Sequence, residues 1–488
     1  MDKKNVWLKY NKAELSKLDA FCEDYRNFIS ECKTERECTD YIVNDLENQG
    51  FVPLKKFVEG KKKIKAGDLI YTVNKNKGIL AFRIGKKPLE EGMNILGAHI
   101  DSPRLDVKQN PLYEDGGFAY LDTHYYGGIK KYQWVTIPLA IHGVVVKKDL
   151  TTTIINLGEE DDDPVFFISD LLIHLSQEQL EKKAAKVIEG EALDIIIGNR
   201  PAATEKTEAK SAAIKTASKA AKVSDASGKD DAVAEKEAVK KSVLALLKEY
   251  YDMEEEDFLS AELEIVPAGR ARDCGLDRSM IMGYGQDDRV CSYPSYRAIA
   301  DIKSVDRTAC CILVDKEEIG SVGATGMTSF FFENTVAELL ALVGDSSDLT
   351  LRRCLSNSNM LSSDVSSAFD PTYASSFDKK NVAYLGNGMV LCKFTGARGK
   401  SGSNDADAEY LGKLRAIFDK DNVSIQLAEL GKVDLGGGGT IAYILAKYGM
   451  NVIDCGVAVL NMHAPFEVTS KADIYETYRG YLSFLRNM

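Results

Sequence analysis

Two adjacent glutamates, Glu317 and Glu318, follow the apolar run Ala309–Val314 and precede the glycine-containing segment Gly320–Gly326. The apolar run predicts a short buried strand, and the glycines predict the turn that ends it. Two carboxylates held side by side at a strand end repel each other unless a cation lies beside them. A bound metal ion would take one carboxylate as a ligand and leave the other free to transfer protons.

Other side chains with metal-binding chemistry also follow apolar runs. The imidazoles and carboxylates in such positions are His99, Asp101, Asp364 and His463, and Asp287 and Asp288 lie on a glycine-containing loop before a predicted helix. In open α/β sheets, ligands bind beyond the carboxyl ends of the strands. Imidazole and carboxylate groups are the ligand set of a zinc-like metal. The pattern therefore predicts a metal site at that edge of a sheet.

Each of these residues also has a purely structural interpretation. A single histidine at a strand end is usually a hydrogen-bonded structural residue. Adjacent glutamates usually lie on a solvated helix, and Asp364 in its serine-rich segment can cap a helix or a turn. His99 is more informative than a single histidine because Asp101, two positions later, can orient its ring and select its tautomer. Glu317 and Glu318 interrupt a strand-then-glycine pattern, which favours a functional role.

Two glycine runs, Gly320–Gly326 and Gly436–Gly439, look superficially like phosphate-binding loops. Neither ends in Gly-Lys-Ser/Thr, and neither lies in a nucleotide-binding fingerprint. We interpret them as places where the backbone approaches a substrate or begins a helix. Gly439, just before Thr440, is therefore a candidate substrate-binding residue.

The elements that must position these residues form an interrupted α/β pattern. Residues 1–50 predict helices, because Phe21, Tyr25 and Phe28 recur at spacings of three and four. Strand and helix patterns then continue to about residue 105 and resume from 261 to 488. We therefore expect residues 1–105 and 261–488 to form one α/β domain.

Residues 106–260 have a different texture. The segments Val135–Val146 and Thr152–Leu157 predict a separate, mostly antiparallel β-rich domain. Residues 201–240 are rich in Ala, Lys, Ser, Glu and Asp, and such a composition cannot bury enough apolar surface to order itself. We interpret this stretch as a surface insertion, with a regulated charged arm as the alternative.

The bulk properties exclude several classes of protein. The chain has 488 residues, enough for two domains, and its 74 acidic and 62 basic residues argue against a nucleic-acid-binding protein. No signal peptide is recognisable, and no stretch approaches the roughly 20 apolar residues of a membrane span. The ten cysteines include no CxxC pair. Several of them, including Cys311, Cys392 and Cys455, lie in apolar runs, and we expect these to be buried, reduced thiols. These features predict a soluble cytoplasmic protein.

The motifs together closely resemble those of the M18 family of metallo-aminopeptidases, the aspartyl aminopeptidase group, in a bacterial-type form. The matching segments span almost the whole chain and are His99–Arg104, Gln286–Arg289, Asp315–Ser321, Ser363–Tyr373 and Met462–Glu467. The resemblance implies a zinc-peptidase-like mixed sheet flanked by helices and interrupted by a smaller β-rich dimerisation domain. It also implies a homo-oligomer of dimers assembled into a dodecamer, and peptides as substrates.

The resemblance further implies a role for each site residue. Asp287, rather than Asp288, would bridge two divalent metal ions, which would be Zn with Co or Mn as alternatives. The remaining ligands would be His99 and Asp364 for one ion, and Glu318 and His463 for the other. Glu317 would act as the general base, and Asp101 would orient His99.

His174 matches a family motif whose histidine reaches into the active site of a neighbouring subunit. Taken by itself, it would be an ordinary residue on an amphipathic helix. A preference for acidic N-terminal residues would need a cation near the substrate, and Lys393 and Arg398 are the candidates. Neutral-preferring relatives leave this preference open.

Two other functions are compatible with the same motifs. A metal-dependent deacylase would share the ligands but would not need a free amine on its substrate. A non-catalytic assembly protein would keep the fold alone, and the presence of Glu317 beside every expected ligand argues against it.

Overall fold

The computed structural model describes residues 5–202, 237–396 and 398–488. The chain forms two compact units. The first comprises Met1–Arg104, Tyr126–Lys130 and Gly269–Met488, and the second comprises Leu105–Tyr125 and Lys131–Ala268. The chain thus leaves the first unit, returns to it briefly at Tyr126–Lys130, and re-enters it for its C-terminal half.

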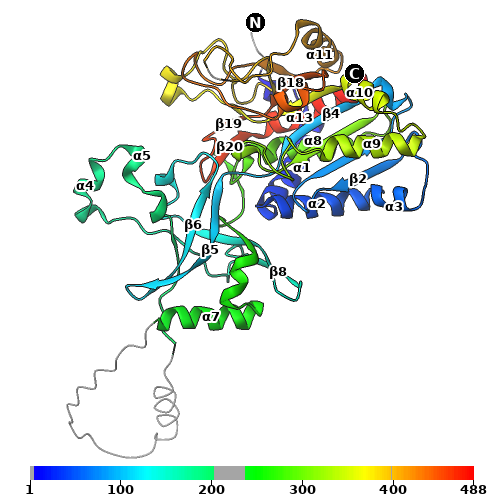
Figure 1. Cartoon of the computed structure of the whole chain (residues 1–488). Helices are drawn as coiled ribbons and strands as arrows, with labels where there is room; N and C mark the ends of the chain where they lie inside the picture. The colour runs from blue at the N-terminus through cyan, green and yellow to red at the C-terminus, as the bar shows by residue number, and fades with distance from the viewer. Residues whose placement is uncertain (1–4, 203–236, 397) are drawn as a thin grey trace, which may run out of the picture. The chain divides into compact units, whose positions relative to one another are not determined.

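The first unit is built on a nine-stranded mixed sheet (Figure 1). In order across the sheet, the strands are β1 (Val52–Pro53), β2 (Leu69–Val73), β3 (Ile79–Arg83), β13 (Ala309–Val314), β4 (Asn94–His99), β14 (Asn359–Ser363), β18 (Asn451–Gly456), β16 (Met389–Cys392) and β17 (Ile425–Leu427). The four central strands, β13, β4, β14 and β18, run parallel. Their carboxyl ends therefore meet at one edge of the sheet.

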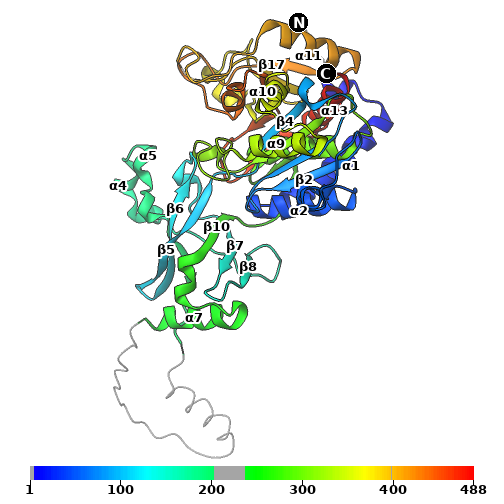
Figure 2. The same ribbon diagram turned by 45° about the vertical axis from the view of Figure 1, so that its right-hand side comes forward.

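Helices cover both faces of this sheet and enclose two apolar cores (Figures 1 and 2). One core contains side chains of α1 (Lys12–Glu31), α2 (Glu35–Asn48), α8 (Gln286–Asp301), α11 (Ala408–Lys420) and α13 (Lys471–Asn487), and the other contains side chains of α3 (Leu54–Glu59), α9 (Phe331–Val343), α10 (Asp348–Ser356) and α12 (Ala442–Ala446). Successive residues of a strand point to opposite faces. Cys311 and Leu313 of β13 accordingly belong to the first core, and Cys310 and Ile312 to the second.

The helices predicted within residues 1–50 are confirmed as α1 and α2. Asn11 and Thr34 cap their N-termini, and the glutamate at the third helical position completes a capping box in each. Tyr25 and Phe28 are buried in the first core, and Phe21 packs against it, as the spacing predicted.

A second, five-stranded sheet lies within the same unit. Its order is β11 (Arg272–Cys274), β12 (Met280–Gly283), β20 (Glu467–Ser470), β19 (Ala458–Leu460) and β15 (Ser366–Ser367). Strand β12 leads into α8, and the loop from β19 to β20 carries His463. Two of the sequence-predicted site residues therefore come from the vicinity of this smaller sheet.

The second unit contains a six-stranded sheet in the order β8 (Thr152–Leu157), β7 (Leu139–Val146), β10 (Ala261–Pro267), β5 (Arg104–Asp115), β6 (Phe118–Tyr126) and β9 (Ile195–Gly198), followed on the chain after β9 by α7 (Ala238–Tyr251). The pairs β8–β7, β7–β10, β10–β5 and β6–β9 are antiparallel. The strand expected from Val135 begins at Leu139, because Thr136 adopts a left-handed φ of 62° and the fixed ring of Pro138 follows. The insertion predicted at 201–240 falls mostly on residues 203–236, outside the described residues.

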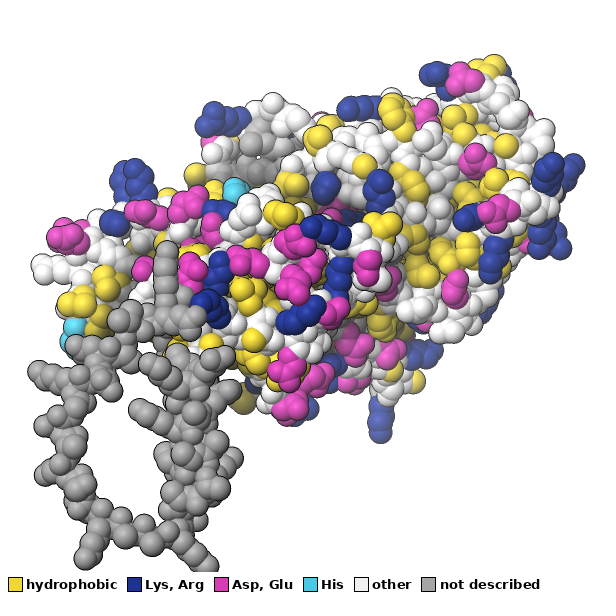
Figure 3. Space-filling view, turned by 60° about the horizontal axis from the view of Figure 1, so that its bottom comes forward, with side chains coloured by type: hydrophobic (Ala, Val, Ile, Leu, Met, Phe, Trp, Pro, Cys, Tyr) yellow, Lys and Arg dark blue, Asp and Glu magenta, His cyan; other side chains and the backbone are white. Residues whose placement is uncertain are grey.

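The surface shows the charge balance expected from the composition. On the described part of the face in Figure 3, acidic and basic side chains are interspersed without an extended basic patch. Within the described ranges, no helix combines the length and the apolar character needed to span a bilayer.

Gly456, the last residue of β18, provides a test of how closely the central strands pack. A Cβ added there would lie 2.0 Å from the backbone oxygen of Asp364 and 2.8 Å from Sγ of Cys291. We expect Gly456→Ala to force β18 away from the segment after β14 and to lower the free energy of unfolding by about 1–3 kcal/mol.

The control is Gly412→Ala in the exposed part of α11, where an added Cβ meets nothing within 4 Å. Alanine in a helix interior is favoured over glycine by about 0.5–1 kcal/mol, so this variant should be slightly stabilised. Thermal unfolding of the two variants measures both effects. Equal changes in Tm would contradict the close packing at Gly456.

Candidate metal centre

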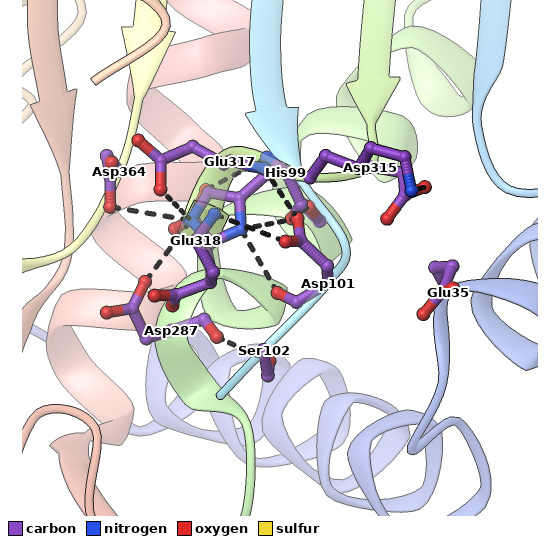
Figure 4. Close-up of polar contacts among 12 residues, drawn as sticks. Glu35, His99, Asp101, Ser102, Asp287, Asp315, Glu317, Glu318 and Asp364 are labelled. Atoms are coloured by element: carbon purple, nitrogen blue, oxygen red, sulfur yellow. Dashed lines mark hydrogen bonds and ion pairs between the residues drawn. The ribbon is translucent and has the colours of Figure 1, made fainter. Parts of the chain in front are cut away.

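His99 ends β4 and lies at the centre of the cluster (Figure 4). The side chain is buried, and its Nε2 lies 3.3 Å from Oδ1 of Asp287 and 3.8 Å from Oδ1 of Asp364. On the other side of the ring, Nδ1 lies 3.3 Å from Oδ1 of Asp101. The imidazole is therefore held between a positioning carboxylate on one side and two candidate ligands on the other.

Asp287 lies between the two histidines of the cluster. Its Oδ1 faces His99, and its Oδ2 lies 3.1 Å from Nε2 of His463. It is located at the start of α8, where the Asp287–Asp288 peptide bond is cis and both residues have non-helical backbone angles. Asp288 instead points to the backbone, where its Oδ2 accepts the N–H of His99 at 3.4 Å. Asp287, rather than Asp288, thus lies between the two imidazoles.

The candidate ligands fall into two groups of three that share Asp287. One is His99, Asp287 and Asp364, and the other is Asp287, Glu318 and His463; within each group the ligand atoms lie within 4.8 Å of one another. The position of His463 differs from the sequence prediction, which placed it at the end of a strand of the main sheet. It follows β19 of the five-stranded sheet, and Asp287 follows β12 of that sheet.

Glu317 lies beside both groups but belongs to neither. Its Oε2 is 3.9 Å from Nε2 of His99. Lys316 and Gly320 flank it with left-handed φ values of 69° and 97°. These two residues bound a single 3-10 turn, Glu317–Ile319, which directs the adjacent side chains of Glu317 and Glu318 toward the cluster.

Asp101 contacts more of the centre than the sequence indicated. Besides its contact with His99, its Oδ1 accepts the backbone N–H of Glu317 and its Oδ2 accepts that of Glu318, both at 3.2 Å. The hydroxyl of Tyr126 also donates to Oδ2, at 2.8 Å. A single fully buried carboxylate therefore connects the imidazole to the turn that carries both glutamates.

The segment Tyr126–Lys130 was missed by sequence reasoning. Tyr126 contacts Asp101, and the carbonyl oxygen of Gly128 lies 2.8 Å from Nδ1 of His463, where it can accept the ring N–H. This contact leaves Nε2 of His463 free to act as a ligand. Nothing in the sequence of this short return to the first unit resembles a metal-binding motif, so only the fold reveals its role.

The electrostatics of the centre favour cations. Burial raises the pKa of Glu317 to about 8, and the charges of Asp364 and Asp287 act in the same direction. Burial also raises the pKa of Glu318 and of Asp364, and in both cases the charge of Asp287 adds to the effect. Four carboxylates and two imidazoles thus share one buried region with too little positive charge.

The pKa of His463 is also raised, but here burial opposes the shift. Burial alone would lower the pKa of the imidazole, but its hydrogen bond with Asp287 and the charges of Asp287 and Glu318 raise it to about 10. In addition, Oε1 of Glu318 is buried and has no hydrogen-bond partner among the described residues. A mixed imidazole and carboxylate donor set with an unsatisfied buried oxygen fits divalent metal ions such as zinc.

A cavity of about 430 Å³ opens beside the centre. Asp287, Glu317, Glu318, Asp364 and His463 line it on one side, and Gly437–Gly439 and Thr440 line it on another. Gly439 therefore lies where a substrate would approach the centre, as its candidate role requires.

The two predicted specificity cations lie outside this lining. Lys393 forms an ion pair with Asp405 at 2.5 Å. Arg398 lines an adjoining cavity of about 300 Å³, which shares Thr395 and Gly437 with the main cavity. Arg398 thus lines a cavity that adjoins the main one, and Lys393 lines neither of the two.

His174 lies in the second unit, on the 3-10 turn Ile173–Leu175. The side chain is exposed, and so are Leu172, Ile173 and Leu175 around it. Such a run of exposed apolar residues differs from the amphipathic helix that local sequence alone would predict.

Comparisons with known proteins agree with this architecture. The family model for aminopeptidase I zinc metalloproteases (M18) matches residues 28–485. The chain is 57% identical over 484 residues to the probable M18 family aminopeptidase 1 of Clostridium acetobutylicum, covering 99% of this chain and 98% of that relative. It is 43% identical over 493 residues to the corresponding protein of Thermotoga maritima, covering 100% of both.

Solved structures show the same fold. The crystal structure of an M18 family aminopeptidase from Thermotoga maritima matches with a TM-score of 0.89 at 43% identity, and that of aminopeptidase I from Clostridium acetobutylicum with 0.85 at 55%; each match covers 100% of both chains. A structure of an mApe1 dodecamer from S. cerevisiae shares the fold at 18% identity, with a TM-score of 0.72 and 96% of this chain covered. By the family model, the sequence identities and the fold, the chain belongs to the M18 family of zinc metallo-aminopeptidases.

Proposed function

We propose that this chain is a two-metal aminopeptidase that removes the N-terminal residue of peptides. The observation that supports this most directly is the pair of three-residue ligand groups sharing Asp287 beside a cavity. One divalent ion would be held by His99, Asp287 and Asp364, and a second by Asp287, Glu318 and His463; Zn is the leading candidate, with Co or Mn as alternatives. Such ions, when bound, polarise a carbonyl group and make water more acidic.

Glu317 is the proposed general base. It lines the cavity, belongs to neither ligand group, and lies close enough to His99 to reach a water molecule attacking a substrate held at the centre. Burial raises the pKa of Glu317 in the metal-free chain, and cations held by the neighbouring ligands would lower it again. The ionised carboxylate could then accept a proton from that water and deliver it to the leaving amine. The water's oxygen forms the new bond to the carbonyl carbon, and the C–N bond breaks as the amine is protonated.

The substrate is proposed to enter past Gly437–Gly439, with its α-amino group directed toward the carboxylates of the centre. An acidic side chain at the N-terminal position would be accommodated by Arg398, which lines the adjoining cavity, rather than by Lys393, which is already paired with Asp405. The cavity walls at Gly438 and Gly439 leave open space where a Cβ would project. Glycine at both positions therefore keeps room for the substrate.

Homo-oligomerisation is proposed to occur through the second unit, as dimers assembled into a dodecamer. The exposed run Leu171–Leu175 supports this, because an apolar surface of this kind is usually covered by a partner. A relative with the same fold is described as a dodecamer. In such an assembly His174 would donate a hydrogen bond in a neighbouring active site. A cytoplasmic location is consistent with ten free thiols.

Substitution of Glu317 tests the proposed general base. We expect Glu317→Gln to lower kcat by about 10²- to 10⁴-fold, the usual contribution of a positioned general base. Its metal content should equal that of the wild type because Glu317 is in neither ligand group. Steady-state kinetics and elemental analysis measure the two quantities, with exposed Glu338→Gln as the matched control. Full activity in Glu317→Gln would exclude the proposed role.

Removal of the metal ions tests the proposed two-metal site. Dialysis against a chelator should abolish activity, and Zn²⁺, Co²⁺ or Mn²⁺ should restore it with two ions bound per chain. Because the pKa of His463 is raised to about 10 without metal, its imidazole is protonated at pH 8, and a ligand must be neutral. Metal addition at pH 8 should therefore release protons, measurable with a pH-indicator dye. A stoichiometry of one ion per chain would contradict the two-site proposal.

Substrates with free and blocked amines separate aminopeptidase from deacylase activity. Aspartyl, glutamyl, leucyl and lysyl p-nitroanilides should be hydrolysed more than about 100-fold faster than their N-acetylated forms, because the site is proposed to bind a charged amine. Comparable rates on blocked and free substrates would favour the deacylase. Arg398→Ala should slow only the two acidic substrates, and Lys393→Ala should change none of the four; the reverse result would exchange their roles.

A further inference from the structure

Glu467 is a buried carboxylate with two short contacts to the candidate metal centre. It begins β20 and is 1% exposed. Its Oε1 accepts the backbone N–H of His463 at 2.8 Å, and its Oε2 accepts the backbone N–H of Asp287 at 3.1 Å. The two oxygens of one side chain therefore hold one ligand from each of two segments that are far apart in the sequence.

The loop that carries His463 needs such an anchor. Both Asn461 and His463 adopt left-handed backbone angles, with φ of 62° and 63°. Non-glycine residues occupy this region only when surrounding contacts stabilise it. Asn461 bonds within the loop to Ala464 and Phe466. The side chain of His463 contacts the carbonyl of Gly128, and its backbone N–H donates to Glu467.

The start of α8 is tied to the same residue a second time. The side-chain amide of Gln286 donates to the backbone carbonyl of Glu467 at 2.7 Å and to that of Ile281 at 3.0 Å. Glu467 thus contacts the α8 start through both its side chain and its backbone. Movement of β20 would displace His463 and Asp287 together.

Asp101 shows the same arrangement on the opposite side of the centre, where one buried carboxylate accepts the backbone N–H groups of Glu317 and Glu318. Glu467 is not among the residues that line the cavity. We infer that Glu467 is a positioning residue that sets the distance between His463 and Asp287 and thereby the affinity of the second metal site. This inference rests on the proposed two-metal function.

The chemistry of the two contacts predicts which substitutions matter. Glu467→Gln replaces one acceptor oxygen by an NH₂ group that would face a backbone N–H, so one of the two contacts is lost. Glu467→Asp keeps the charge but withdraws the carboxylate by one methylene, so it cannot reach both donors. Loss of such contacts around a metal typically weakens binding by about 10- to 100-fold.

Asp473 provides a matched control within the same unit. It is also fully buried, and its two oxygens accept the backbone N–H groups of Gly386 and Gly388, each at 2.7 Å. It contacts neither ligand group. Asp473→Asn therefore loses one contact of the same kind of double backbone contact without changing a candidate ligand.

The test is a Zn²⁺ titration of the full-length, metal-free protein against a chromophoric chelator. We expect Glu467→Gln to bind one of its two equivalents of Zn²⁺ at least tenfold more weakly than wild type, and Glu467→Asp to be weakened less. Asp473→Asn should bind within twofold of wild type, whatever its Tm. If Glu467→Gln does not fold, Glu467→Asp must still bind one equivalent more than twofold more weakly than both wild type and Asp473→Asn.

Wild-type affinity in the folded Glu467 variants would overturn the inference. Equal weakening in Asp473→Asn would also overturn it, because the effect would then be a general loss of stability. Failure of the wild type to bind two Zn²⁺ ions would instead overturn the two-metal proposal itself. The kinetic readout, in which Glu467→Gln regains kcat as Zn²⁺ is raised to saturation, distinguishes weakened binding from a lost catalytic group.

Discussion

The mutual repulsion of Asp287, Glu317, Glu318 and Asp364 is the constraint on which the arrangement of the first unit depends. Four carboxylates around two imidazoles in a buried region are unfavourable without cations, and this appears as raised pKa values for three of them. A flexible site would relieve the repulsion by moving the side chains apart. The surrounding structure prevents this, so the site is kept ready for metal ions at a cost in the stability of the metal-free chain.

The rigidity comes from how the ligands are attached rather than from the ligands themselves. His99 and Asp364 are attached to the parallel strands β4 and β14, whose residues are all buried. Asp287 and His463 come from beside the five-stranded sheet, whose strands β12 and β19 contribute Ile281 and Val459 to the first core. Backbone hydrogen bonds to buried carboxylates join the parts: Asp101 on one side and Glu467 on the other. These hydrogen bonds are directional, so they hold the two joined segments at a defined separation.

Glycines line one side of the cavity beside the centre. A loop that must approach a substrate closely cannot carry side chains, and an added Cβ at Gly438 or Gly439 would project into open space. The fold places no demand for glycine there, since neither residue has a positive φ. In the proposed function, glycine at these positions keeps room for the substrate.

Much of the first unit was predictable from sequence because burial and periodicity are local properties. The buried runs before His99, Glu317 and Asp364 predicted β4, β13 and β14, and the spacing of aromatic residues predicted α1 and α2. The candidate ligands could be named because imidazoles and carboxylates are conspicuous where a buried strand ends.

The tertiary structure decided which of these residues meet. The resemblance favoured Asp287 over Asp288 as a ligand, and the backbone at the start of α8 directs Asp287 toward both histidines. The contributions of Tyr126, Gly128 and Glu467 were invisible in the sequence. Contacts between segments far apart in the chain depend on sheet order and on where each loop returns, and no local pattern encodes that geometry. The sequence by itself thus determined the chemistry available to this protein, and the fold determined its spatial arrangement.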